Sequence, residues 1–182
     1  MTVERCALLL RAVNVSGRNR VPMAELRAVL AERTSLRNVS TYIASGNVIA
    51  DVPGEIDAAC VQVRMLIHKA FEVDTPVIAR THEQLITALE ANPFPDAAAE
   101  KMLHVMFLES DPLPGALDAL RQRLLPGERI ALSGRDLWID YPTTGVANTK
   151  LTKAVLDRAL GVAGTARNLL TLRTLAELTA SV

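Results

Sequence analysis

Hydrophobic and polar positions follow one another along the chain in a pattern that predicts strands and helices in turn. Residues 6–10 form an uninterrupted apolar run bounded by charged residues, which is typical of a central strand covered on both faces. From Met23 to Arg33 the apolar residues recur at helical spacing. Pro22 suits the first turn of that helix, because its missing N–H group would have no partner there. The chain therefore opens with a buried strand and an amphipathic helix.

The next segment predicts a hairpin and a second helix. Residues 38–45 and 47–51 predict two strands joined by a tight turn at Ser45-Gly46, where the glycine supplies a positive φ angle. From Glu55 to Phe71 the apolar positions give the most regular 3.6-residue pattern of the whole chain. His68 falls on the polar side of this helix, so we expect it to be solvated rather than catalytic.

A short strand and a third helix follow in the first half. Residues 75–80 predict the strand, and Thr81 and Gln84 have the spacing of a capping box that opens a helix. Asn92-Pro93 ends that helix, because a residue before proline avoids the helical conformation. The order strand, helix, strand, strand, helix, strand is that of a ferredoxin-like domain.

The second half repeats this order of elements without a close sequence repeat. We place the boundary in the polar, alanine-rich stretch 96–100 and predict an α+β protein of two ferredoxin-like (βαββαβ-type) subdomains in tandem, residues 1–95 and 101–182. Thr171 is the expected cap of a C-terminal helix at residues 169–178. The other elements predicted in this half are strands at residues 102–108, 130–132 and 137–141 and helices at residues 113–124 and 151–159.

Composition narrows the classes of function. The 182 residues are 49% hydrophobic and 22% charged, which is typical of a folded protein. The formal net charge of +0 provides no overall field that would attract nucleic acid or a membrane, so any anion must be bound by a local site. Aromatic residues make up only 3% of the chain, too few for a surface that stacks nucleic-acid bases.

The sequence predicts neither a metal site nor a cofactor. Cys6 and Cys60 lie in apolar periodic segments, where a free cysteine acts as a small hydrophobic residue rather than as a disulfide partner or a zinc ligand. The first apolar run ends at Arg11 and is too short for a signal peptide or a membrane span. We therefore expect a cytoplasmic protein without membrane attachment.

The polar loop at residues 11–22 is the leading candidate for chemistry. It places arginine, asparagine and serine side chains, with Gly17, between a strand and a helix N-terminus, where unpaired amides and the helix dipole favour an anion. The Gly-Lys-Ser/Thr ending of a phosphate loop and the pattern Gly-x-Gly-x-x-Gly are both absent. The alternative interpretation is a set of turn formers with a solvated rim of arginines.

Three further polar clusters could complete such a site. Ser45-Gly46-Asn47 lies in the predicted hairpin turn, and residues 165–168 precede the last helix. Residues 144–150 join a strand to a helix start that Asn148 or Thr149 would cap. Each cluster alone is equally explained by turn formation, helix capping or surface salt links. These clusters would form a binding site only if the fold brings them together.

His104 is the one polar residue within the apolar run 102–108. We expect a histidine that is buried and hydrogen-bonded between the two subdomains, and a general base is the second interpretation. No acidic pair, neighbouring cysteine or second histidine supports catalysis. The sequence therefore leaves open whether the protein is an enzyme.

Four stretches of the sequence carry a resemblance to a known family. Residues 8–26, residues 41–48, Asn92-Pro93-Phe94 and residues 165–168 are similar to the bacterial family called domain of unknown function 1697, and the likeness runs almost from end to end. The resemblance implies two α+β subdomains of ferredoxin-like character. It implies no activity, since none is established for the family.

The chain departs from the family pattern at three positions. Glycine is typical of the family where this chain has Ala12 and Ser16, and tryptophan is common where it has Leu169. The missing glycines weaken the expectation that the loop backbone approaches a ligand closely.

Our leading hypothesis is an uncharacterised bacterial protein that binds an anionic small molecule, a nucleotide or a nucleic-acid backbone in a polar cleft between the subdomains. The basic residues would neutralise charge and the amides would orient the ligand. One alternative is an enzyme acting on a phosphorylated substrate, with His104 or Ser45 taking part, and another is an interaction or assembly module without a ligand. The expected ligand-binding residues are Arg11, Asn14, Gly17, Arg18, Asn19, Ser45, Asn47, Lys150, Arg167 and Asn168.

Overall fold

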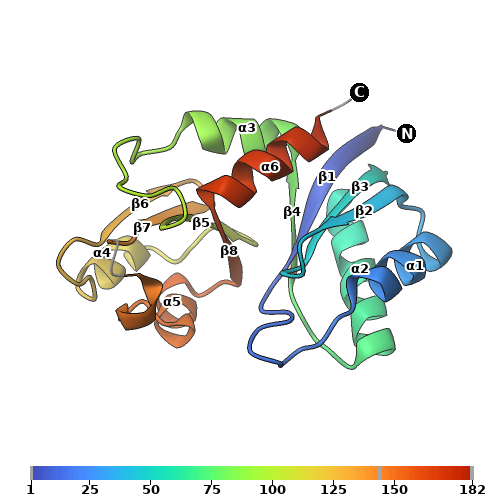
Figure 1. The fold of residues 1–182 in the computed structure, drawn as a ribbon, viewed down its shortest axis with the longest axis horizontal. Helices are drawn as coiled ribbons and strands as arrows, with labels where there is room; N and C mark the ends of the chain where they lie inside the picture. The colour runs from blue at the N-terminus through green and yellow to red at the C-terminus, as the bar shows by residue number, and fades with distance from the viewer. Residues whose placement is uncertain (1, 143–144, 181–182) are drawn as a thin grey trace. The chain divides into compact units, whose positions relative to one another are not determined.

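Each half of the chain forms its own four-stranded antiparallel sheet, coloured from blue to green in the first half and from yellow to red in the second (Figure 1). The computed structural model describes residues 2–142 and 145–180. The chain divides into two units. The first unit contains the residues up to Ile86 and those from Thr174 onward, and the second unit runs from Thr87 to Arg173.

Seven elements follow one another from the N-terminus: β1 (Val3–Leu10), α1 (Met23–Arg33), β2 (Arg37–Tyr42), β3 (Asn47–Pro53), α2 (Ile56–Phe71), β4 (Val77–Thr81) and α3 (His82–Glu90). The strand order in the first sheet is β2-β3-β1-β4, so β1 is an internal strand. Residues 6–10 have no exposed surface. Both faces of β1 are therefore covered, as its continuous apolar run predicts.

Helices α1 and α2 cover one face of the first sheet. Cys6, Leu8 and Leu10 of β1 belong to one buried cluster with Leu30 of α1 and Ile67 of α2. Both helices lie where the sequence predicts them. Their apolar residues recur at helical spacing, so that they face this sheet.

The second half contains β5 (Leu103–Leu108), α4 (Ala116–Arg121), β6 (Arg129–Ser133), β7 (Asp136–Asp140), the 3₁₀ helix η1 (Val146–Asn148), α5 (Lys153–Leu160), β8 (Gly164–Asn168) and α6 (Leu169–Thr179). The strand order in its sheet is β6-β7-β5-β8, which is the order of the first sheet with each strand replaced by its counterpart. The predicted fold class, an α+β protein of two tandem ferredoxin-like subdomains, is thereby confirmed. Within the described residues, no helix is long and apolar enough to cross a membrane.

Both sheets end in the same local structure, which the sequence analysis did not recognise as a repeat. Ala79-Arg80-Thr81 closes β4 and Ala166-Arg167-Asn168 closes β8. In each motif the arginine is buried, and its Nη1 donates to the carbonyl oxygen of the preceding alanine, over 2.9 Å in β4 and 2.8 Å in β8. The third residue then caps the helix that follows. The two halves therefore share a three-residue motif as well as an order of elements.

The observed helix caps confirm one predicted cap and correct two others. Thr81 and Gln84 form the predicted capping box, because each backbone N–H donates to the other side chain. The cap of α6 is Asn168 rather than Thr171, since Asn168 Oδ1 accepts from the Thr171 N–H over 2.9 Å. Helix α5 is capped by Thr152, because the chain forms η1 and is still extended at Thr149, so neither Asn148 nor Thr149 caps a helix there.

Two further elements differ from the prediction. Helix α4 runs from Ala116 to Arg121, inside the predicted residues 113–124. It cannot begin before Ala116, because Gly115 has a φ of 79°, which is not helical. Residues 164–168 form strand β8, where the sequence indicated only a polar cluster. Of the polar cluster at residues 144–150, Thr144 lies outside the described residues.

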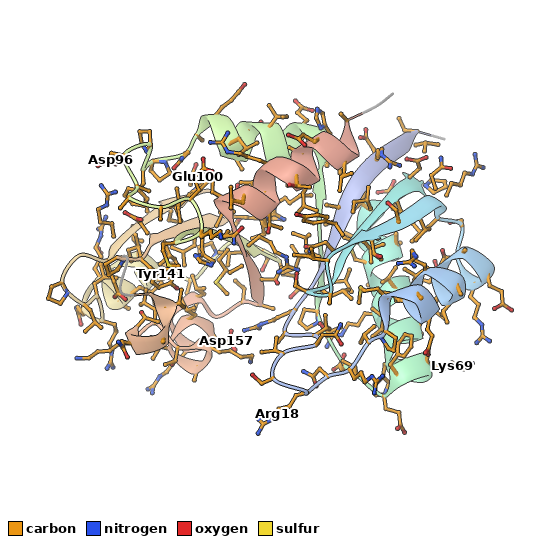
Figure 2. All side chains as sticks on the ribbon, viewed as in Figure 1. Arg18, Lys69, Asp96, Glu100, Tyr141 and Asp157 are labelled. Atoms are coloured by element: carbon orange, nitrogen blue, oxygen red, sulfur yellow. The ribbon has the colours of Figure 1, made fainter. Side chains whose placement is uncertain are left out.

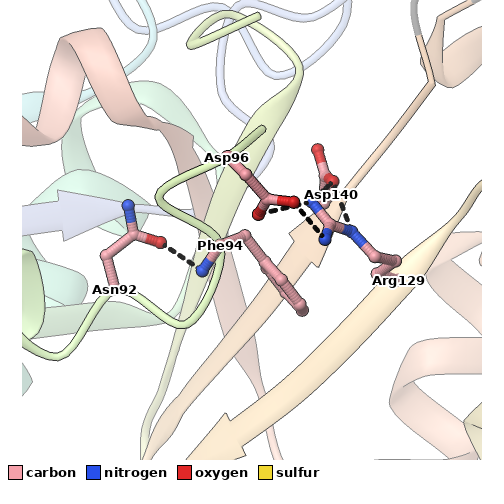
Figure 3. A network of polar contacts seen from close by, with 5 residues as sticks. All are labelled: Asn92, Phe94, Asp96, Arg129 and Asp140. Carbon is pink, nitrogen blue, oxygen red and sulfur yellow. Dashed lines mark hydrogen bonds and ion pairs between the residues drawn. The ribbon is translucent and has the colours of Figure 1, made fainter. Parts of the chain in front are cut away.

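Arg129 fixes the segment after α3 to the second sheet (Figure 3). Its guanidinium donates to both carboxylate oxygens of Asp96, over 3.1 and 3.2 Å, and to Asp140 Oδ2 over 2.6 and 2.9 Å. The ring of Phe94 lies 4.6 Å from the same guanidinium, and Asn92 Oδ1 accepts from the Phe94 N–H. The Asn-Pro-Phe stretch of the family resemblance therefore has a structural role, as a clamp on β6 and β7.

We predict that this clamp makes stability fall in acid. Hydrogen bonds from Arg129 hold the pKa of Asp96 below its usual value, so the contribution of this pair is complete above the ordinary aspartate pKa and is lost as the pH falls through the lowered one. The Asp96→Asn variant should lose less stability than the wild type between pH 5 and pH 2, as followed by urea unfolding. Asp57→Asn, at an exposed aspartate of α2 that makes no ion pair in the described part of the chain, is the control. Equal pH dependence of wild type and Asp96→Asn would contradict this account.

Candidate functional site

The loop between β1 and α1, residues 11–22, is called the arginine loop below. Its backbone is unusual, because left-handed conformations are uncommon for residues other than glycine and unfavourable by roughly 1 kcal/mol each. Other interactions must therefore hold the loop in this shape. The residues with positive φ in this loop are Ala12 (51°), Asn14 (54°), Ser16 (50°), Gly17 (75°) and Asn19 (50°).

The side chain of Asn14 holds the arginine loop together. Its Nδ2 donates to the carbonyl oxygen of Val21 over 2.9 Å and to that of Ala44 over 2.8 Å, while its Oδ1 accepts from the Val21 N–H over 2.8 Å. Both amide donors of Asn14 are thus used by the main chain. One residue therefore ties the two ends of the loop to each other and to the turn between β2 and β3.

Further hydrogen bonds fix the base and the tip of the loop. Thr75 accepts from the Arg11 N–H over 2.9 Å and donates to the Arg11 carbonyl over 2.7 Å. Asn19 Nδ2 donates to the Ala12 carbonyl over 2.9 Å. At the tip, the Arg18 N–H donates to the Val15 carbonyl over 2.9 Å, and both residues between them have positive φ, as a tight type I′ turn requires.

The turn between β2 and β3, residues 43–46, packs closely against the arginine loop. The Leu10 N–H donates to the Gly46 carbonyl over 2.8 Å. Gly46 has the positive φ that the sequence predicts, at 85°, and a Cβ there would lie 2.6 Å from Val13 Cγ2. Asn47 has no exposed surface, and its Nδ2 donates to the Tyr42 carbonyl and to Ser45 Oγ. The predicted residues Ser45 and Asn47 therefore shape the turn that supports the loop.

The positive charge of the loop lies at its exposed part. Arg18 points away from the ribbon, as Figure 2 shows, and Arg20 is exposed as well. In the described part of the chain, neither guanidinium makes a hydrogen bond or an ion pair. The sequence holds no acidic residue from Cys6 to Ala24 that could neutralise them. The list of expected ligand residues omitted Arg20, although this acid-free stretch was a signal for it.

Two aliphatic side chains are exposed beside these charges. Val15 at the loop tip is 54% exposed, and Ile43 in the neighbouring turn is 51% exposed. Ile43 also has a φ of 49°, which is a strained conformation for a β-branched residue. Strained backbone conformations of this kind persist only where the surrounding structure holds them in place. They are found most often at functional sites.

The remaining predicted residues lie in the second unit and differ in character. Lys150 is exposed between η1 and α5. Arg167 is buried in β8, where its Nη1 donates to Thr165 Oγ1 over 2.7 Å and burial lowers its pKa to about 10. Asn168 caps α6. The structure thus brings together the predicted residues of the arginine loop and of the adjacent turn, and a wider cleft with these three residues stays a prediction.

His104 has a hydrogen bond within its own unit, and the expected hydrogen bond between the subdomains stays a prediction. Its Nδ1 lies 3.1 Å from the Met102 carbonyl, and its ring meets that of Tyr141 edge to face with 5.3 Å between centroids. Burial lowers its pKa, which favours the neutral imidazole. No three His, Cys, Asp or Glu side chains within residues 2–142 and 145–180 are grouped so that they could hold a metal ion.

Fold and loop together define a protein of two tandem ferredoxin-like halves whose first half carries a rigid, basic loop. The chain belongs to the protein family of unknown function DUF1697, whose family model matches residues 3–138. Its structure is similar to that of the conserved bacterial protein SP0830 from Streptococcus pneumoniae, with a TM-score of 0.77, 21% sequence identity and coverage of 98% of this chain and 100% of that one. This likeness shows the fold alone. None of the curated proteins compared with the chain matches it.

We predict that glycine stabilises the two positions where the family pattern has glycine and this chain has Ala12 and Ser16. Ala12 and Ser16 both have positive φ, so Ala12→Gly and Ser16→Gly remove strain that exceeds the added freedom of the unfolded chain. Each variant should raise the free energy of unfolding by about 0.5 kcal/mol in urea titrations. Ala28→Gly in α1, where glycine should reduce stability by about 1 kcal/mol, is the control. A loss at Ala12→Gly equal to that at Ala28→Gly would contradict the strained geometry.

Gly46 should tolerate a side chain less well than Gly134, its counterpart in the turn between β6 and β7. Both have positive φ, but a Cβ at Gly134 meets no atom within 4 Å. We expect Gly46→Ala to lower the free energy of unfolding by about 2 kcal/mol or more and Gly134→Ala by about 1 kcal/mol. Chemical unfolding of both variants measures the difference. Equal losses would show that Leu10 and Val13 do not pack against this turn as described.

Proposed function

We propose that the protein binds the phosphate backbone of a nucleic acid at the arginine loop of its first unit. The observation that carries this proposal is the pair of exposed guanidiniums, Arg18 and Arg20, which have no partner in the described part of the chain and sit on a loop held rigid by Asn14. Arginine donates bidentate hydrogen bonds to phosphate oxygens, and a rigid loop loses little conformational freedom on binding.

The second unit supports the proposal because it shows what the fold itself requires. The connection from β5 to α4 is the counterpart of the arginine loop, yet it is shorter and contains Glu109 and Asp111. The turn between β6 and β7 is also shorter than the turn between β2 and β3. The first unit therefore has two extended connections that the fold does not need, and they are joined to each other by Asn14. Extended loops on a rigid scaffold are typical of binding sites.

The exposure of this surface favours a long polyanion over a small molecule. Small ligands are bound mostly in concave pockets, whereas Arg18 and Arg20 are exposed on the loop surface. Two free arginines on an exposed loop suit successive phosphates of a backbone, with Val15 and Ile43 in reach of sugars. Since the net charge is +0, the attraction is local and we expect weak binding that salt reduces further.

The test compares a loop variant with a variant of equal charge. Fluorescence anisotropy with labelled single- and double-stranded oligonucleotides is measured for wild type, Arg18→Ala/Arg20→Ala and the control Arg33→Ala/Lys69→Ala, whose two residues are exposed on α1 and α2. We expect the loop variant to bind about tenfold more weakly at low salt and to lose a salt slope of about 1.4 for a single strand or 1.8 for a duplex. The control should match the wild type.

Three outcomes would refute the proposal: no binding by the wild type at low salt, equal loss in both variants, or unchanged binding by Arg18→Ala/Arg20→Ala. Pyrophosphate and ATP serve as competitors. If either competes at micromolar concentration, the loop binds a small phosphorylated molecule instead, and the preference for a backbone is wrong.

A further inference from the structure

A cavity of about 560 Å³ lies between α4 and α5 of the second unit. This volume is within the range of small-molecule sites. Its lining includes small and apolar residues, among them Ala116 and Ala119 from α4 and Val155 from α5, together with the polar Gln122 and two arginines, Arg123 and Arg158. No acidic residue belongs to the lining. The cavity therefore combines a compact apolar wall with two positive charges.

The acidic residues of α4 and α5 form ion pairs with basic residues other than Arg123 and Arg158. Asp118 accepts from Arg121 over 3.0 Å, and Asp157, labelled in Figure 2, accepts from Lys153 over 2.9 Å. Neither Arg121 nor Lys153 lines the cavity. Arg123 and Arg158 make no hydrogen bond or ion pair through their side chains in the part of the chain that the structure describes. Their charges are thus uncompensated by the protein.

Leu113 forms part of the apolar wall of the cavity. Leu113 is 54% exposed at its rim, and its N–H donates to the Leu160 carbonyl over 2.9 Å. Gly161 lies directly beneath it, since a Cβ at Gly161 would be 2.5 Å from the Leu113 side chain. The absence of a side chain at Gly161 therefore leaves the space that Leu113 occupies. A preformed apolar wall reduces the entropy lost on binding.

Another cavity, of about 320 Å³ beside α2, provides a comparison. It is also lined by an arginine, Arg64, but that guanidinium donates to both oxygens of Asp74, over 2.6 and 2.9 Å. Its charge is already neutralised by a neighbour in the same lining. In the cavity between α4 and α5, by contrast, no carboxylate of the described chain engages Arg123 or Arg158.

We infer that the cavity between α4 and α5 binds a small organic anion, with a compact apolar body and one carboxylate or phosphate group. The acidic group accepts hydrogen bonds from Arg123 and Arg158, and the apolar body lies against Ala119, Val155 and Leu113. The site is independent of the arginine loop, which belongs to the other unit.

The experiment screens matched pairs of anionic and neutral probes on the full chain. Phenyl phosphate, benzoate and butyrate are compared with benzyl alcohol, benzamide and butyramide at concentrations up to about 10 mM, by isothermal titration and by heteronuclear NMR shifts. We expect at least one of the anions to bind and its neutral partner not to bind. A preference for phenyl phosphate over benzoate assigns the natural ligand to phosphate esters, and the reverse preference assigns it to carboxylic acids.

Variants then locate the site. Arg123→Ala and Arg158→Ala should each weaken binding by about tenfold, and Lys101→Ala, an exposed cation of the same unit outside the lining, should leave it unchanged. Ala119→Leu should weaken binding while keeping both charges, because the larger side chain occupies part of the cavity where the apolar body would lie. Failure of every anion to bind at about 10 mM, or equal binding by Arg158→Ala and wild type, would overturn the inference.

Discussion

The three hydrogen bonds of the Asn14 side chain are the interaction on which the candidate site depends. They join the two ends of the arginine loop and connect the loop to the turn that follows β2. Ala12 and Ser16 have left-handed backbone conformations, each unfavourable by roughly 1 kcal/mol. Without the hydrogen bonds of Asn14, we expect the loop to leave this conformation. Asn14 was expected to orient a ligand, and the structure gives its donors to the main chain instead. In the proposed function, Asn14 would act by holding the loop that carries Arg18 and Arg20.

Comparison of the two halves distinguishes the features that the shared fold requires from the features that occur in one half only. Both halves have the same strand order and the same Ala-Arg-Thr/Asn ending, so these features belong to the scaffold. The long basic loop occurs only in the first half, and the cavity with Arg123 and Arg158 occurs in the second. Each half therefore has its own pair of exposed arginines on the same fold, Arg18 and Arg20 in the first and Arg123 and Arg158 in the second, although the net charge of the chain is +0.

Local sequence patterns predicted the fold well because most elements are determined by their own residues. The buried run of β1, the spacing of α2 and the capping box at Thr81 are all short-range signals, and all were confirmed. The misplaced caps of α5 and α6 arose where several polar residues compete, and only the observed backbone decides among them. The candidate site was harder, since hydrogen bonds such as that between Asn14 and Ala44 link residues far apart in the chain. The cavity was not predicted, because no sequence pattern shows that two helices leave a space.

The central claim is that the arginine loop is a binding surface as well as a rigid turn. The most direct measurement is to map backbone amide shifts of the ¹⁵N-labelled protein during titration with a short oligonucleotide at low salt. The account predicts that the largest shifts fall on residues 12–20 and 43–47 and that they fade as salt is added. Saturable binding that leaves those amides unshifted, or shifts spread evenly over both units, would contradict it.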